Sequence, residues 1–124
     1  MIRLTREKAL LLYRLMAEAT GGSGGVRNED MLDSALENAF SSWNGWELCP
    51  TKEEKAARLG SSLSSYHRFL DGNRGTGLFV MLAFLEMNGI PIQCTDEEIV
   101  AIGLALADGT MGYEQLLQWV RDHK

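Results

Sequence analysis

The sequence predicts an all-α fold, a compact bundle of six helices around a central apolar helix. Three observations support this prediction. Apolar residues recur at spacings of three and four along most of the 124 residues, one segment at 76–88 is apolar on nearly every side, and no two segments alternate as paired strands would. A chain of this length can bury about two-thirds of its unfolded surface in one core, so we expect a single domain over residues 1–124.

Capping residues and glycines delimit the first two helices. Thr5 can cap a helix that ends at the glycine-rich segment 21–25, and Asn28 can cap the next one. The glycine-rich segment could cradle a phosphate, but no Lys-Ser/Thr follows it as a P-loop requires, so a flexible connector is the favoured interpretation. Residues 41–50 are expected to form a loop or a short extended flap.

The second half of the chain carries stronger start and stop signals. Two capping boxes, with Thr and Glu three residues apart, predict helix starts; they are Thr51 with Glu54 and Thr95 with Glu98. They predict helices over 52–66 and 95–109. The apolar helix at 76–88 lies between them, and a last helix is predicted over about 112–122.

Composition excludes several classes of protein. With 12 basic and 17 acidic residues the net charge is −5, which argues against direct binding of nucleic acid because phosphates need a basic face. Cys49 and Cys94 are too few for a disulfide framework or a zinc site and suit a reducing cytosol. No apolar run reaches ~18 residues, so neither a signal peptide nor a membrane span is expected, and we expect a cytoplasmic protein.

The segment 67–75, His-Arg-Phe-Leu-Asp-Gly-Asn-Arg-Gly, carries most of the candidate chemistry. Its glycines allow backbone amides to approach an anion, and the positive end of the following helix would face the same anion. Asp71 offers the hard oxygen that Mg²⁺ requires, Asn73 can bind a phosphate oxygen, and His67 suits a general base at neutral pH. A purely structural turn is the alternative, since Asp-Gly is a common turn pair.

The pattern His-x-Phe-x-Asp-Gly-Asn followed by a basic residue resembles the signature of the Fic/Doc superfamily, in particular the short death-on-curing (Doc) toxin branch. Further segments resemble Doc-branch segments in order and spacing; they are 25–29, 32–36, 47–51, 54–57 and 84–89. Together they cover most of residues 5–122. The resemblance implies a Fic/Doc-like helical bundle.

The resemblance also implies an activity. Members transfer part of ATP to a protein hydroxyl: most Fic enzymes deliver AMP, and the Doc branch moves the γ-phosphate to a threonine of elongation factor Tu and halts translation. ATP and Mg²⁺ are the implied cofactors, with His67 as the catalytic base and Asp71 as the metal ligand. The implied nucleotide-binding positions are Gly72, Asn73, Arg74 and Gly75.

Two residues depart from the family pattern. Arg68 stands where the family has Pro, Ile or another apolar residue, and Gly75 stands where it has an arginine that grips phosphate. Arg74 is a poor substitute, because adjacent helical residues point about 100° apart. One charge-assisted contact contributes roughly 1.5–3 kcal/mol, so we expect a rate lowered by ~10- to 100-fold, or by ~10³ or more if the arginine acts like an arginine finger. Each departure is one base change from the family residue, so detoxification during cloning of a lethal gene is a further hypothesis.

Two classes of function therefore remain open at this point. The first is a toxin-type protein kinase attenuated at Gly75, with AMP transfer as an alternative reaction. The second is an inactive relative that binds a small Phd-like antitoxin. Trp43 and Trp46 either belong to the core or line a flap that receives a partner segment. The segment 110–115 has only part of the spacing of a built-in inhibitory motif, so we expect inhibition by a separate antitoxin.

Overall fold

The computed structural model describes residues 4–19, 29–65 and 76–124. Within these ranges the chain forms six α-helices and one short β-hairpin. In chain order they are α1 (Arg6–Ala19), α2 (Glu29–Phe40), β1 (Ser42–Trp43), β2 (Trp46–Glu47), α3 (Lys52–Ser65), α4 (Thr76–Met87), α5 (Asp96–Asp108) and α6 (Tyr113–His123). The prediction of an all-α fold with six helices is confirmed for the described residues.

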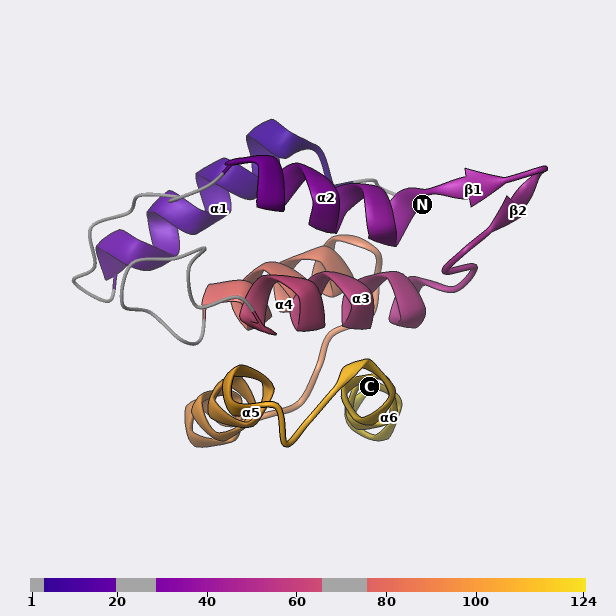
Figure 1. Cartoon of the computed structure of the whole chain (residues 1–124). Helices are drawn as coiled ribbons and strands as arrows, with labels where there is room; N and C mark the ends of the chain where they lie inside the picture. The colour runs from indigo at the N-terminus through magenta and orange to yellow at the C-terminus, as the bar shows by residue number, and fades with distance from the viewer. Residues whose placement is uncertain (1–3, 20–28, 66–75) are drawn as a thin grey trace.

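The helices lie in three layers (Figure 1). Helices α1 and α2 form one outer layer, α3 and α4 form the middle layer, and α5 and α6 form the other outer layer. The hairpin projects from the body at the end where α2 finishes and α3 begins. The middle layer is therefore covered on both faces and positions the other elements.

The helix starts follow the capping residues that the sequence predicts. The backbone N–H of Lys8 donates to the Thr5 hydroxyl at 3.2 Å, and Thr95 forms a complete capping box with Glu98. At the start of α3 the backbone N–H of Glu54 donates to the Thr51 hydroxyl at 3.1 Å. The predictions for Asn28 and for the segment 21–25 lie outside the described residues.

Helix α4 supplies the largest share of the core. Five of its side chains are fully buried: Leu78, Val80, Met81, Phe84 and Leu85. Phe84 meets Phe40 of α2 edge to face, with ring centroids 5.6 Å apart. The helix has 12 residues, and none of the described helices is both long and apolar enough to cross a bilayer. The prediction of an enclosed apolar helix is confirmed.

Helix α3 shares the central position, which the sequence did not predict. Its residues are more polar than those of α4, yet it contacts α2, α4, α5 and α6. Small buried residues make this possible, because they let neighbouring helices approach closely; they are Ala56, Ala57, Gly60, Ser61 and Ser64. On the α6 side, the Arg58 guanidinium lies 3.7 Å from the ring centroid of Tyr113. Burial raises the pKa of Tyr113.

The hairpin corrects the expectation that the chain has no paired strands. β1 and β2 are antiparallel, with Ser42 opposite Glu47 and Trp43 opposite Trp46. The turn residues Asn44 and Gly45 have φ of 50° and 79°, as a two-residue type I′ turn requires. The Asn-Gly pair is the sequence signal for this hairpin. Of the two forms expected for residues 41–50, a loop or a short extended flap, the structure shows the flap.

The contact between Phe84 and Phe40 generates a stability prediction. We expect Phe84→Ala to lower the free energy of unfolding by about 3–5 kcal/mol, because it leaves a cavity where α2 and α4 meet. Urea denaturation measures this change. Glu86→Ala, at an exposed position of α4, is the control and should change stability by no more than about 0.5 kcal/mol. Equal effects of the two variants would contradict the assigned packing.

Candidate functional site

Every site residue that the sequence predicts lies outside the described residues. The predicted base is His67, the predicted metal ligand is Asp71, and the predicted nucleotide-binding positions are Gly72, Asn73, Arg74 and Gly75. The structure describes the two elements that this segment joins. Helix α3 ends at Ser65 and α4 begins at Thr76, so what can be built from contacts is the frame of the site.

The frame consists of two antiparallel helices in contact along their whole length. Three facing pairs mark the contact from one end to the other; they are Ser64 with Gly77, Gly60 with Met81, and Lys52 with Asn88. At the far end, Lys52 Nζ donates to the Asn88 carbonyl at 3.2 Å. The end of α3 and the start of α4 consequently lie together. The described residues on either side of the segment 66–75 are therefore close in space.

Gly77 sets how closely the two helices approach beside this segment. A Cβ atom at Gly77 would lie 2.8 Å from Ser64 Oγ, 2.9 Å from Leu63 Cβ and 3.1 Å from the Leu63 carbonyl carbon. These distances leave no room for a side chain, and the Leu63 atoms belong to or adjoin the backbone. Ser64 Oγ is buried and has no hydrogen-bond partner among the described residues. Any side chain at position 77 would therefore force its neighbours to shift, so the structure favours glycine there.

The N-terminus of α4 differs electrostatically from the starts of α3 and α5. Helices α3 and α5 carry acidic residues in their first turns, whereas α4 carries none. The first amide groups of a helix have no partner within the helix, and the helix dipole places a partial positive charge there. The first turn of α4, which directly follows the segment 66–75, therefore offers a positive end that no carboxylate of its own neutralises.

The described residues contain no group of three or more His, Cys, Asp or Glu side chains placed to hold a metal ion. The metal prediction depends on Asp71, which lies outside the described ranges. The assignment of Mg²⁺ to this residue stays a prediction.

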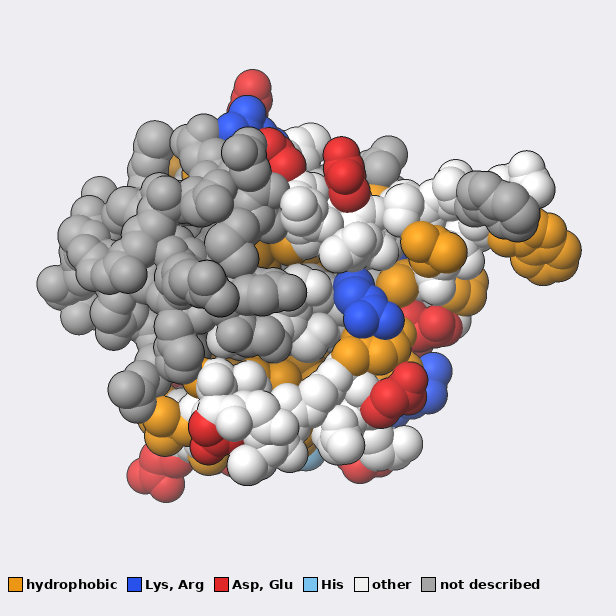
Figure 2. Space-filling view, viewed as in Figure 1, with side chains coloured by type: hydrophobic (Ala, Val, Ile, Leu, Met, Phe, Trp, Pro, Cys, Tyr) orange, Lys and Arg blue, Asp and Glu red, His pale blue; other side chains and the backbone are white. Residues whose placement is uncertain are grey.

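The hairpin exposes apolar side chains, and this decides one of the two alternatives for the tryptophans. Trp46 is 78 % exposed and Leu48 is 64 % exposed, so Trp46 is not a core residue; the side chain of Trp43 is outside the described set. Figure 2 shows hydrophobic side chains on the surface of the projecting hairpin. The hairpin lies at the N-terminal end of α3, and the 14 residues of this helix span about 21 Å. A partner that touches both the hairpin and the far end of α3 must cover that length.

Sequence reasoning missed two residues that shape this region, Gly77 and Lys55. Lys55 is only 2 % exposed, and its ammonium group donates to the Cys49 carbonyl. The signal for Lys55 was its place in the Glu-Lys-Ala-Ala segment 54–57, where a lysine precedes two small residues on a buried face. Gly77 gave no local signal, because only its neighbour across the helix contact excludes a side chain.

Comparison with known proteins identifies the family. The family model described as "Fic/DOC family" matches residues 3–85, which is more than half of the chain. The protein named Toxin Doc from Mycolicibacterium smegmatis (strain ATCC 700084 / mc(2)155) is 34% identical over 74 residues. This match covers 60% of the present chain and 57% of that toxin.

The chain belongs to the Fic/DOC family. Its identity with a Doc toxin supports the Doc branch within that family. The segment 67–75 lies inside the region that the family model matches.

The helix contact beside the site generates a second prediction. Overpacking against Leu63 and Ser64 should cost about 1–3 kcal/mol and gained helix propensity should offset about 1 kcal/mol, so we expect Gly77→Ala to lower the free energy of unfolding by up to about 2 kcal/mol. Gly60→Ala is the matched comparison, because its two closest contacts are atoms of flexible side chains, Met81 Sδ at 2.8 Å and Leu116 Cδ2 at 3.1 Å. Gly60→Ala should therefore cost less.

Urea denaturation of both variants beside the wild type tests this ranking. The assignment of Gly77 as the residue that sets the helix approach would be wrong if Gly77→Ala were as stable as Gly60→Ala or more stable.

Proposed function

We propose that this chain is a Doc-type toxin that transfers the γ-phosphate of ATP to a Ser/Thr hydroxyl of a translation factor such as elongation factor Tu. The observation that carries the proposal is the position of the Asp-Gly-Asn motif. In a chain of the Fic/DOC family, it ends three residues before α4 begins at Thr76, and the first turn of α4 has no acidic residue. An amide-rich, positive helix end suits phosphate, and the motif supplies the other polar groups.

Each polar residue of the motif has a separate role in the proposed reaction. His67 accepts the proton of the target hydroxyl as it attacks. Asp71 holds the cation, while the Gly72 amide and the Asn73 side chain hold phosphate oxygens. The target oxygen bonds to the γ-phosphorus as the bond from that phosphorus to the β–γ bridging oxygen breaks, so ADP is the leaving group. Mg²⁺ bound with the nucleotide would neutralise the developing charge. Arg74 adds a positive charge to the phosphate site.

Gly75 accounts for the lowered activity that we propose. The family places a phosphate-gripping arginine at this position. Phosphoryl transfer depends mainly on positioning and on electrostatic stabilisation, so a missing cation is costly. The loss of one charge-assisted contact predicts a rate ~10- to 100-fold below that of a complete motif.

The absence of the motif arginine at Gly75 also favours a second candidate function. If the chain lacks catalytic activity altogether, it acts as a binding partner of a small Phd-like antitoxin. The exposed Trp46 and Leu48 provide an apolar surface on which a partner segment could lie. AMP transfer is the alternative reaction, and labelled ATP separates the two: γ-label marks phosphate transfer, and α-label marks AMP transfer.

Restoring the motif arginine tests the proposed function. We expect Gly75→Arg to raise ATP-dependent labelling of elongation factor Tu by about 10- to 100-fold and to make expression toxic, because it returns the missing phosphate contact. The measurement is transfer of γ-label to the purified factor, together with growth of the host.

The double variant Gly75→Arg/His67→Ala is the control, and it should lose both effects because no base remains. A folded Gly75→Arg protein that neither labels the factor nor slows growth would favour the antitoxin-binding function.

Nucleotide binding can be tested separately from transfer. We expect Mg-ATP, titrated to concentrations on the order of millimolar, to shift the NMR signals of residues 71–76 in the unmodified chain, because amides can bind phosphate without the arginine. Asp71→Asn should weaken the dependence of these shifts on Mg²⁺. Signals at 71–76 that stay unchanged while others move would place the nucleotide elsewhere.

A further inference from the structure

Lys55 is a cation in a place that helix electrostatics and solvation both disfavour. It lies in the first turn of α3, where the helix dipole disfavours positive charge, and its side chain is almost completely buried. A buried ammonium group is retained only where other groups replace its hydration. The partners of Lys55 therefore indicate what the residue does.

Those partners are Glu47, the last residue of β2, and Cys49, which lies between the hairpin and α3. Lys55 Nζ donates to the Cys49 carbonyl and lies 3.4 Å from Glu47 Oε1. Cys49 is itself buried, and its thiol lies 3.8 Å from the Asn38 carbonyl of α2. One side of Cys49 thus meets α2 and the other meets α3.

A backbone hydrogen bond closes the base of the hairpin next to these contacts. The backbone N–H of Leu48 donates to the Ser41 carbonyl at 3.1 Å, next to the residue that Lys55 holds. The exposed side chains of Trp46 and Leu48 follow on the outer side. A hairpin of two-residue strands has little stability of its own, so its position depends on how its base is attached.

We infer that Lys55 is a positioning residue that fastens the base of the β1–β2 hairpin to α3 through the Cys49 carbonyl and Glu47. It keeps the exposed face of the hairpin in one orientation for the protein that the chain binds. The second part of this inference rests on the proposed function, with the protein substrate as the partner. The first part concerns the fold alone and is tested without any activity.

Hydrogen exchange of the Leu48 amide reports on the hairpin base. We expect Lys55→Met, which keeps the length of the side chain but removes its donor, to speed exchange at Leu48 by about 10- to 100-fold. Exchange at Ile99 in α5, whose N–H bonds to the Thr95 carbonyl, should stay unchanged. Unchanged exchange at Leu48, or equal acceleration at both amides, would overturn the inference.

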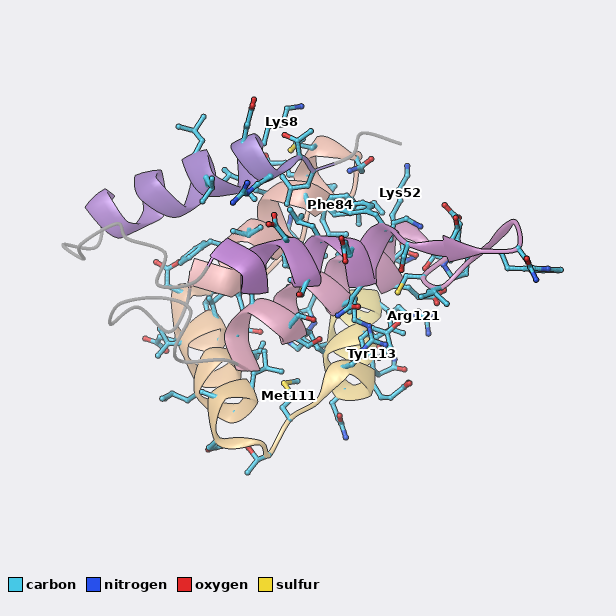
Figure 3. All side chains as sticks on the ribbon, turned by 45° about the horizontal axis from the view of Figure 1, so that its top comes forward. Lys8, Lys52, Phe84, Met111, Tyr113 and Arg121 are labelled. Carbon is cyan, nitrogen blue, oxygen red and sulfur yellow. The ribbon has the colours of Figure 1, made fainter. Side chains whose placement is uncertain are left out.

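Matched variants separate fastening from general loss of charge. Lys52 lies at the same end of α3 (Figure 3), but it bonds to Asn88 at the end of α4. Lys52→Met should therefore leave Leu48 exchange unchanged, and acceleration there would count against the role of Lys55. If Lys55→Met fails to fold, the surface variant Glu47→Gln carries the test. It should speed Leu48 exchange by about two- to five-fold, and no change would overturn the contribution of the ion pair.

Enzyme kinetics test the second part, in the Gly75→Arg background where transfer is restored. Adding Lys55→Met should raise the KM for elongation factor Tu by about 10-fold, while kcat and the KM for Mg-ATP stay the same, because the chemistry lies in a different segment. A fall in kcat with unchanged KM values would overturn the positioning role. If Gly75→Arg is inactive, the proposed function fails, but the exchange result still decides whether Lys55 fastens the hairpin.

Discussion

The close contact between α3 and α4 is the constraint on which the rest of the structure depends. Small residues of α3 allow α4 to approach, and Gly77 on α4 allows the same from the other side beside Ser64. Dense packing of this kind makes side-chain volume decisive, because neighbouring atoms have little room to move. The two helices form the middle layer, and the outer layers pack on its faces.

This layer gives the two ends of α3 different neighbours. At its N-terminal end, Lys55 holds the base of the hairpin through Cys49. At its C-terminal end, the chain enters the segment 66–75 and returns as α4. A helix is stiff over this length, so α3 keeps the hairpin at one end apart from its own C-terminal end at Ser65. Under the proposed function, changes at the hairpin and changes in the segment 66–75 are therefore expected to act separately.

Much of the secondary structure could be predicted because its signals are local. The capping box of Thr95 and Glu98 predicted a helix start that the structure contains, and the continuous apolar run predicted α4. The hairpin had an equally local signal in Asn44 and Gly45, which favour the type I′ turn that the structure shows. It was overlooked because strands of two residues show no alternating pattern.

The amino-acid pattern by itself determined the family, the helical class and the residue types available at 67–75, since motif spacing and helical periodicity are properties of neighbouring residues. Tertiary structure alone decided that the more polar helix α3 shares the centre and that position 77 favours glycine. It also decided that Lys55 is buried. Lysine is normally exposed. The buried ammonium group of Lys55 needs the carbonyl oxygen of Cys49 as its partner. The spacing of residues in the sequence does not show that the fold places this carbonyl beside Lys55.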